Sequence, residues 1–232
     1  MKIIILAAGK GTRLGNNIPK ILTTLPGNKT IMDRLLNSIT PFVKQIDISL
    51  VVGYKKNLII KKNPSLNYIL NNNYEITNTA KSLALALDNI ENETIIWING
   101  DLVMDENIFK HVYTYDGNCM AVSNKTILDE EEIKYTTNSK GSIEMVSKTV
   151  KNGLGEAFGI NKISKNDLNL FKESLNKCAD NDYFEKGLEI AISDGLIINP
   201  LNINNLFYTE IDFKKDLEYA VQFLKKKEKF YE

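Results

Sequence analysis

The stretch that decides the fold is Lys2–Ala8, with the sequence KIIILAA, followed at once by Gly9 and a loop rich in Gly and Asn. After its first residue the stretch is apolar and rich in β-branched side chains, a pattern typical of a strand covered on both faces by helices. The same alternation repeats along the chain, with apolar strands expected at 46–52 and 94–99 and helices between them. Strands that alternate with helices predict an α/β protein with a parallel sheet covered on both sides.

The expected secondary structure extends over most of the chain. Thr30 and Asp33 resemble a capping box, which places the start of the first helix at Ile31. The acidic stretch 128–138 is interpreted as a surface excursion, and no linker divides the sequence, so 1–232 is expected to be one domain. Strands are expected at 2–8, 46–52, 67–71, 94–99, 118–123, 142–147, 153–160 and 205–211, and helices at 31–39, 55–62, 78–90, 105–113, 164–178, 181–193 and 213–227.

The charge balance argues against nucleic acid as a partner. The 232 residues include 29 Lys plus Arg and 29 Asp plus Glu, whereas nucleic-acid binders usually carry a basic excess. No apolar run approaches the roughly 18 residues of a membrane span, and the N-terminal apolar stretch is shorter than the core of about 7–15 residues in a signal peptide. We therefore expect a cytoplasmic protein that acts without a membrane. A homodimer is compatible with this sequence.

The side chains that could bind metals or act as nucleophiles narrow the chemistry. His111 is the one histidine of the sequence, which excludes a multi-histidine metal site and argues against a Ser–His–Asp mechanism. Cys119 and Cys178 have no metal-type spacing and are expected to be reduced thiols. Any metal ion is therefore expected on carboxylate oxygens, which favours Mg²⁺ or Mn²⁺.

The loop after the first strand is suited to phosphate groups. Leu6–Leu14 reads LAAGKGTRL, and Gly9 and Gly11 allow its backbone N–H groups to approach an anionic ligand. Arg13 offers a planar fork of donors, and Lys20, which follows a proline, offers a point charge. The loop is not a Walker A motif, and it lacks the third glycine of the dinucleotide fingerprint. The loop therefore favours a di- or triphosphate that is bound differently from the phosphates in either of these two motifs.

This run resembles the L-A-A-G-x-G-x-R-(L/M)…P-K signature of nucleotidyltransferases, which transfer a nucleoside monophosphate from a triphosphate to a phosphorylated acceptor and release pyrophosphate. The resemblance extends over nearly the whole chain and includes Gly100-Asp101 after an apolar strand and Glu210-Ile211-Asp212 near the C-terminus. It implies an α/β fold of the Rossmann-like kind, a three-layer sandwich with a mostly parallel central sheet. It also implies a small acceptor-binding subsheet, here at about 116–160.

A second resemblance points to the base. Asn71, Tyr74, Asn78 and Ser82 are similar to the N-x-x-Y-x-x-x-N-N-x-x-S-L segment of bacterial phosphocholine cytidylyltransferases, although Thr79 replaces the second Asn of the pair. The resemblance favours CTP, while Asn78 could also be only the N-cap of the following helix. The residues expected to bind the nucleotide are Leu6, Ala7, Ala8, Gly9, Gly11, Thr12, Arg13, Lys20, Asn78, Ser82 and Gly100.

The implied reaction needs no general base, because the attacking phosphate has a second pKa of about 6 and is mostly ionised at neutral pH. It needs relief of the repulsion between two polyanions and in-line placement at the α-phosphorus. Asp101 and Asp212 follow strands and are the expected ligands of Mg²⁺ or Mn²⁺, although each could instead only cap a helix. Arg13 and Lys20 are expected to act in catalysis by neutralising the departing pyrophosphate.

The acceptor site is expected in the second half of the chain. The family resemblance suggests that Lys148, with Lys151 as its alternative, meets the acceptor phosphate and takes part in catalysis. Glu156 is expected to contact the acceptor, and Glu185 and Glu210 are weaker candidates.

The acceptor itself is less well defined. An aromatic cage would favour choline, but Trp97 is expected in the core. Tyr183 and Phe184 could contribute, yet no aromatic cluster is evident. We therefore expect a small phosphorylated or phosphonylated acceptor that carries an amine, of the phosphoglutamine, phosphocholine or aminoalkylphosphonate type, used for cell-surface or capsule decoration. The alternatives are a sugar-1-phosphate nucleotidyltransferase, a metal-dependent glycosyltransferase and a non-catalytic nucleotide-binding module.

Overall fold

The computed structural model describes residues 1–15, 17–124, 128, 130 and 132–229. The centre of the fold is a run of parallel strands, in which β1 lies between β6 and β4. Ile3, Ile4 and Ile5 of β1 are fully buried, as expected for a strand covered on both faces. In order across the sheet, these strands are β6 (Ile95–Asn99), β1 (Lys2–Ala7), β4 (Ile48–Val52) and β5 (Asn67–Leu70).

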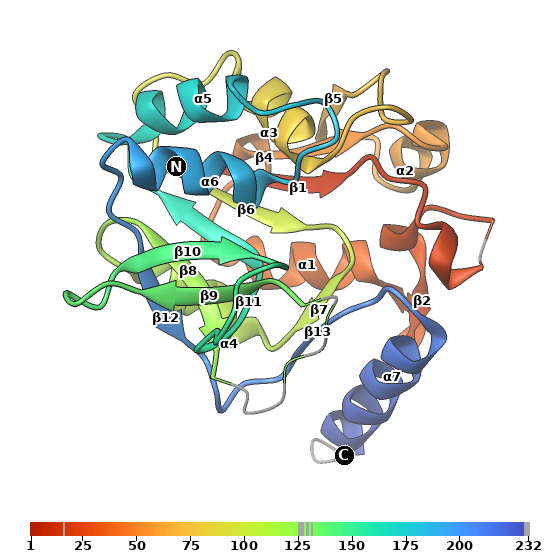
Figure 1. The fold of residues 1–232 in the computed structure, drawn as a ribbon. Coiled ribbons are helices and arrows are strands. Elements are labelled where there is room, and N and C mark those ends of the chain that lie inside the picture. Colours follow the sequence, from red (N-terminus) through yellow and green to blue (C-terminus); the bar gives the residue numbers. More distant parts are fainter. Residues whose placement is uncertain (16, 125–127, 129, 131, 230–232) are drawn as a thin grey trace.

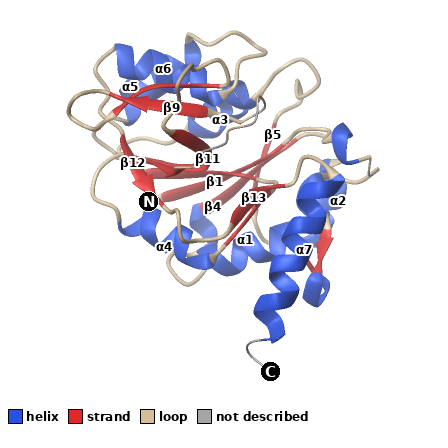
Figure 2. Cartoon of the chain, turned by 60° about the horizontal axis from the view of Figure 1, so that its bottom comes forward, coloured by secondary structure: helices blue, strands red, loops and turns tan. Residues whose placement is uncertain are grey.

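Helices cover both faces of the sheet, which confirms the three layers (Figures 1 and 2). Ile4 and Leu6 pack with the helices of one layer, whereas Ile3 and Ile5 pack with those of the other. The first layer holds α3 (Thr79–Leu87), α5 (Leu168–Asn176) and α6 (Phe184–Ser193); the second holds α1 (Ile31–Ile39), α2 (Lys56–Lys62) and α4 (Glu106–Thr114).

The strands of the second half extend the same sheet. Strand β11 pairs antiparallel with β6 near one end, at Ile160 and Ile98, and with β9 near the other, at Gly155 and Tyr135. The strands expected in a subsheet at about 116–160 are continuous with the central sheet, and the β9–β10 hairpin belongs to one nine-stranded sheet. The added strands are β8 (Cys119–Ser123), β9 (Lys134–Thr137), β10 (Ile143–Ser147), β11 (Gly155–Ile163) and β12 (Asn199–Asn202).

Several elements differ from the sequence prediction. The sequence predicts a helix from Ser164, but α5 begins at Leu168, after a turn in which the Asp167 N–H donates to the Ser164 carbonyl at 3.1 Å. The stretch 128–138 is not wholly an excursion, since it contains β9; residues 129 and 131 lie outside the described part of the chain. The sequence also misses β12 and β7 (Leu102–Met104), and β13 (Tyr208–Glu210) is shorter than predicted.

Two short elements and the last helix complete the fold. Strands β2 (Thr24–Leu25) and β3 (Lys29–Thr30) flank the predicted turn, and α7 (Lys214–Lys229) follows β13. The capping box of α1 is confirmed, with Thr30 Oγ1 accepting from the N–H of Asp33 at 3.2 Å and the Thr30 N–H donating to the Asp33 carboxylate at 2.8 Å. Among the described residues, no helix is both long and apolar enough to cross a membrane.

Candidate active site

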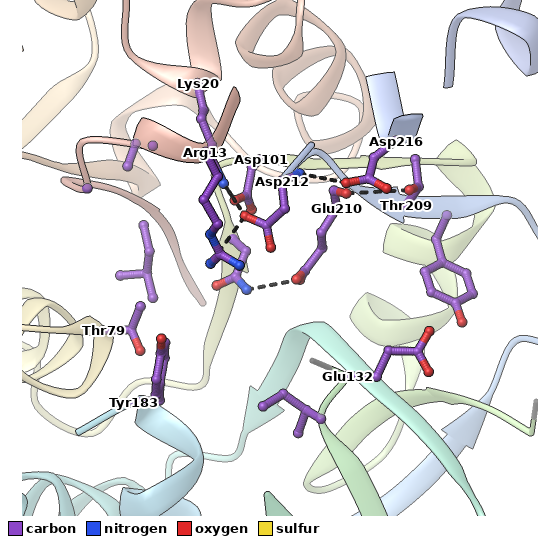
Figure 3. Close-up of a pocket in the computed structure, with 18 of the residues that line it drawn as sticks. Arg13, Lys20, Thr79, Asp101, Glu132, Tyr183, Thr209, Glu210, Asp212 and Asp216 are labelled. Atoms are coloured by element: carbon purple, nitrogen blue, oxygen red, sulfur yellow. Dashed lines mark hydrogen bonds and ion pairs between the residues drawn. The ribbon is translucent and has the colours of Figure 1, made fainter. Parts of the chain in front are cut away.

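A cavity of about 1000 Å³ opens where β1 and β6 end (Figure 3). It brings together segments that are far apart in the sequence, namely the loop after β1, the start of α3, the turn after β6, the β9–β10 region and the starts of α6 and α7. Ala8 and Ser82, which were also predicted to bind the nucleotide, are buried and do not line the cavity. The predicted residues that line it are Leu6, Ala7, Gly9, Gly11, Thr12, Arg13, Lys20, Asn78, Gly100, Asp101, Lys148, Glu156, Glu185, Glu210 and Asp212.

Glycines allow the closest approaches in the loop. Gly11 has a φ of +59°, and a Cβ there would lie 2.4 Å from Cγ of Lys20, so a larger residue would both strain the backbone and displace the lysine stem. A Cβ on Gly100 would lie 2.6 Å from the carbonyl oxygen of Leu6. The absence of a side chain at these two positions thus allows the lysine stem and the end of β6 to pack closely against the loop.

Lys20 lies between the two predicted metal ligands. Its Nζ is 3.0 Å from an oxygen of Asp101 and also donates to Asp212, while Nη2 of Arg13 is 3.6 Å from the same oxygen of Asp212. Figure 3 shows both basic side chains directed at the two carboxylates. Burial alone lowers the pKa of Lys20, but the two carboxylates outweigh this effect and the pKa is raised. Lys20 is therefore a fixed positive charge at neutral pH.

A third carboxylate lies beside this cluster. Glu210 Oε1 accepts hydrogen bonds from the Asn99 side chain and from the N–H of Gly159, each at 3.0 Å. Burial, followed by the charge of Asp101, raises the pKa of Glu210 to about 8. Glu210 thus ties together β6, β11 and β13, a role that its sequence neighbourhood does not reveal.

Asp216 fixes the backbone that carries Asp212. Its carboxylate accepts from the N–H groups of Asp212, at 3.1 Å, and Phe213, at 2.7 Å. Asp216 therefore satisfies donors at the start of α7, in the manner of a residue in the first helical turn. Sequence reasoning missed this residue, although an acidic residue in the first turn of the predicted helix was the available signal.

The donor atoms at this point fit a hard divalent cation. Asp101 and Asp212 come from two different strand ends, and their oxygens meet at one nitrogen, that of Lys20. No group of three or more His, Cys, Asp or Glu side chains suited to a metal ion occurs within the described ranges. Two carboxylates are a set that Mg²⁺ commonly uses, with water and substrate phosphates as its other ligands.

The predicted base-binding segment is partly structural. The Asn78 carboxamide accepts from the N–H of Thr79 at 2.9 Å and donates to the carbonyl of Asn181 at 3.3 Å, which confirms its capping role. Ser82 is corrected: its hydroxyl accepts from the Asn71 side chain at 3.0 Å inside the protein. The similar motif thus shapes the wall of the cavity, with Tyr74 and Asn78 exposed to it.

Aromatic side chains gather at the other end of the cavity, where the sequence showed no cluster. Tyr208 stacks on Phe158 with ring centroids 4.0 Å apart, and its hydroxyl donates to Glu156 at 2.5 Å. The Lys148 ammonium lies 5.4 Å from the centre of the Tyr183 ring. The cavity is also lined by Phe184, Phe207 and Tyr219, and by Phe213, whose ring lies 5.4 Å from the Arg13 guanidinium beside the charged cluster.

The remaining predictions for this end have clear outcomes. Trp97 is fully buried against Phe171 and Phe184, which confirms its place in the core. Lys148 lines the cavity, whereas Lys151 is exposed outside its lining. Glu185 also lines the cavity with only 9% of its surface exposed, and burial raises its pKa to about 7.

A glycine-rich loop and basic residues facing two carboxylates define a nucleotide-binding α/β protein. The sequence profile of the MobA-like NTP transferase domain matches residues 3–126, just over half of the chain, and the chain belongs to this family. It therefore carries a nucleotidyltransferase domain.

Similar proteins agree with this assignment. The bifunctional protein GlmU of Sulfurimonas denitrificans is 26% identical over 239 aligned positions, which cover 95% of this chain and 52% of that protein. The chain thus spans about half the length of this curated relative.

Solved structures share the fold. The CTP:phosphocholine cytidylyltransferase of Streptococcus pneumoniae superposes with a TM-score of 0.80 at 19% identity, covering 96% of this chain and 98% of that one. The inositol-1-phosphate CTP transferase of T. maritima gives a TM-score of 0.75 at 20% identity, covering 95% and 96%.

Proposed function

We propose that this protein transfers CMP from CTP to a small phosphorylated or phosphonylated acceptor that carries an amine, and releases pyrophosphate. The observation that carries the proposal is one cavity with two chemically different ends. One end places Arg13 and Lys20 opposite Asp101 and Asp212, as a triphosphate requires. The other end, around Lys148, has room for a second ligand.

The chain's own residues can support an in-line displacement. An oxygen of the acceptor phosphate forms a bond to the α-phosphorus, and the bond from that phosphorus to the bridging oxygen breaks, so that the electron pair leaves with pyrophosphate. The attacking oxygen is already ionised, so no proton has to be removed. Lys20 and Arg13 stabilise the charge that grows on the departing group. Asp101 and Asp212 would hold Mg²⁺ or Mn²⁺, which supplies further charge neutralisation between the two polyanions.

CTP is the preferred donor in this proposal. Support comes from the resemblance of Asn71, Tyr74 and Asn78 to cytidylyltransferases, and from the position of Tyr74 and Asn78 in the cavity wall. A pocket that pairs with the cytosine amino group leaves a buried polar group unpaired when UTP binds, at a cost of about 1–3 kcal/mol.

The amine is inferred from the charges at the acceptor end. Lys148 supplies a cation for the acceptor phosphoryl group, and Glu132, Glu156 and Glu185 supply carboxylates in the same lining. Carboxylates beside an anionic ligand are unfavourable unless that ligand also carries a positive charge. We assign the ammonium to the region of Glu156.

Pyrophosphate release, measured for four nucleoside triphosphates against a panel of phosphorylated compounds, tests the proposal. The panel contains phosphoethanolamine, 2-aminoethylphosphonate, phosphocholine, inositol 1-phosphate and glucose 1-phosphate. We expect release with CTP and an amine-bearing acceptor. Equal turnover with UTP and CTP would contradict the proposed preference for cytosine. Turnover with only inositol 1-phosphate or glucose 1-phosphate would contradict the amine-bearing acceptor and favour an acceptor of the sugar or polyol type.

A hydroxyl-bearing acceptor is the second candidate. The oxygens of Glu156 and Tyr208 can accept hydrogen bonds from hydroxyl groups, since the Tyr208 hydroxyl itself donates to Glu156. One protein of the same fold acts on inositol 1-phosphate by its name. The same assay matrix separates this candidate from the first. Membership of the NTP transferase family argues against the glycosyltransferase, and the intact charged cluster argues against a non-catalytic module.

A further inference from the structure

An ion pair joins the glycine-rich loop to the segment of the cavity wall where the proposed cytosine lies. Lys10 directly follows Gly9 in the loop after β1, and Glu75 directly follows Tyr74 in the turn before α3. The two charged side chains meet at 2.7 Å, and both residues line the cavity. Glu75 is therefore a charged group on the wall that is assigned to the base.

The turn that carries Glu75 has a well-supported backbone. The N–H groups of Ile76 and Thr77 both donate to the carbonyl of Asn73 at 3.0 Å. Tyr74 packs against the residue that follows β4, where a Cβ on Gly53 would lie 2.6 Å from the Cβ of Tyr74. The turn thus fixes where the Glu75 side chain leaves the backbone, and Lys10 holds its carboxylate.

Two polar neighbours of Glu75 on this wall already have protein partners. The Thr77 hydroxyl accepts from the Asn71 side chain at 3.0 Å and donates to the carbonyl of Asn73 at 2.9 Å. The Asn78 carboxamide caps α3 with its oxygen and donates from its nitrogen to the loop before α6. Both side chains are therefore committed to the structure of the wall itself.

Glu75 differs from these neighbours because its carboxylate is accessible and only partly engaged. Lys10 meets Oε1, and among the described residues no other group pairs with this carboxylate. The side chain is 57% exposed, so a ligand in the cavity reaches it without displacing a protein group. The ion pair with Lys10 lowers the pKa of Glu75. The carboxylate is therefore ionised at neutral pH, and in that state it only accepts hydrogen bonds, at about four lone-pair sites.

We infer that the Glu75 carboxylate accepts a hydrogen bond from the 4-amino group of cytosine and thereby selects CTP over UTP. Carboxylates pair with this amino group, whereas uracil has a carbonyl oxygen at the same position, which cannot donate and is repelled by a carboxylate. Lys10 balances the charge of Glu75 and so reduces its repulsion of the triphosphate. This inference rests on the proposed function and identifies the residue responsible for its base preference.

Nucleotide binding in the absence of an acceptor isolates this contact. Calorimetry compares CTP, UTP and the triphosphate of pyrimidin-2-one riboside, an analogue that keeps the ring and N3 of cytosine and has hydrogen in place of the amino group. We expect the intact protein, with Mg²⁺, to bind CTP about 10-fold more tightly than either of the other two. Equal affinities for CTP and the analogue would overturn the inference.

Substitutions at Glu75 assign the preference to this residue. Glu75→Met removes the hydrogen-bond acceptor and should bring the affinities for CTP and the analogue close together. Glu75→Gln introduces an amide that can donate to the uracil oxygen as well as accept from the cytosine amino group, so the ratio between CTP and UTP should fall toward one. A merely structural role would weaken all three nucleotides alike and leave these ratios unchanged.

Glu91→Gln is the matched control, because Glu91 is an exposed carboxylate between α3 and β6, outside the cavity lining. This control should keep the wild-type ratios. An unchanged ratio in Glu75→Met would refute the role of Glu75 while the preference for CTP stands. If the intact protein binds CTP and UTP equally, the base preference of the proposed function and this inference both fail, and the nucleotidyl transfer stands.

Discussion

The two ends of the cavity differ in how their charges are satisfied. At the end proposed to bind the nucleotide, called here the donor end, Lys20 already pairs with Asp101 and Asp212. At the acceptor end, Glu185 keeps an oxygen without a partner among the described residues. A paired cluster holds its geometry before ligands arrive, whereas an unpaired buried carboxylate oxygen destabilises the ligand-free fold. The end with the paired cluster is thus preorganised, and the end with Glu185 contains a costly buried group.

The largest expected effect comes from removing one carboxylate of the donor cluster. Asp101→Asn and Asp212→Asn should each lower pyrophosphate release by at least about 10²–10³-fold, the scale for loss of one group that stabilises the transition state. Asp47→Asn is the control, since Asp47 pairs with Lys2 at 2.6 Å outside the cavity lining. Near wild-type turnover of either cavity variant, or full activity in excess chelator, would contradict the metal assignment.

A second prediction tests whether the Lys20 ammonium occupies the position in which Mg²⁺ or Mn²⁺ would bind between Asp101 and Asp212. Lys20→Met should lower turnover by about 10²-fold and yet tighten Mn²⁺ binding without nucleotide, because two carboxylates lose their ammonium partner. Mn²⁺ binding is measured by electron paramagnetic resonance, with Lys177→Met as the control because Lys177 pairs with Asp194 outside the cavity lining.

The kinetic signature of that variant also orients the cavity. A raised acceptor KM as its sole effect would place Lys20 in the acceptor site. Weaker Mn²⁺ binding would show that the lysine does not compete with the cation.

A smaller effect is expected at Glu156. Glu156→Gln should raise the KM of an amine acceptor by about 10-fold, since one charge–charge contact is lost, and should leave the KM of CTP unchanged. Glu144→Gln, on the exposed side of β10, serves as the control. An unchanged acceptor KM would remove Glu156 from the proposed ammonium site.

The last prediction concerns stability and involves no change in turnover. Burial raises the pKa of Glu185 to about 7; a backbone hydrogen bond and the charge of Lys148 oppose this shift in part, and the charge of Glu189 adds to it. A carboxyl whose pKa is higher in the folded state makes the free energy of unfolding fall as pH rises between the unfolded and folded values. Glu185→Gln should therefore stabilise the ligand-free protein by about 1–3 kcal/mol at pH 8 and by little at pH 5. Equal denaturation midpoints for both proteins at pH 8 would contradict this.

The sequence predicts the donor end well, because its groups follow directly from strands and a short motif. Strand Lys2–Ala7 has a continuous apolar run and helix Ile31–Ile39 begins at a capping box, and their bounds come out almost unchanged. Parallel strands end at the same edge, so the loop after β1 and Asp101 after β6 had to meet there.

The acceptor end is much less predictable. Strands of three or four residues such as β7 and β12 are too short to show a period. Tyr183 and Tyr208 reach one cavity only through tertiary packing. The unpaired oxygen of Glu185 depends on every neighbour around it, which no local pattern records.

The continuous pairing of β11 has a consequence for how the chain is divided. The family profile ends at residue 126, and a chain cut there would leave β6 without the strand on one of its two sides. The strand that carries the buried Trp97 would then be an unpaired edge strand, and such strands promote aggregation by pairing with other chains. Asp212 would be missing as well. We therefore expect the segment with the recognisable motif to need the rest of the chain in order to cover its sheet edge and complete the charged cluster.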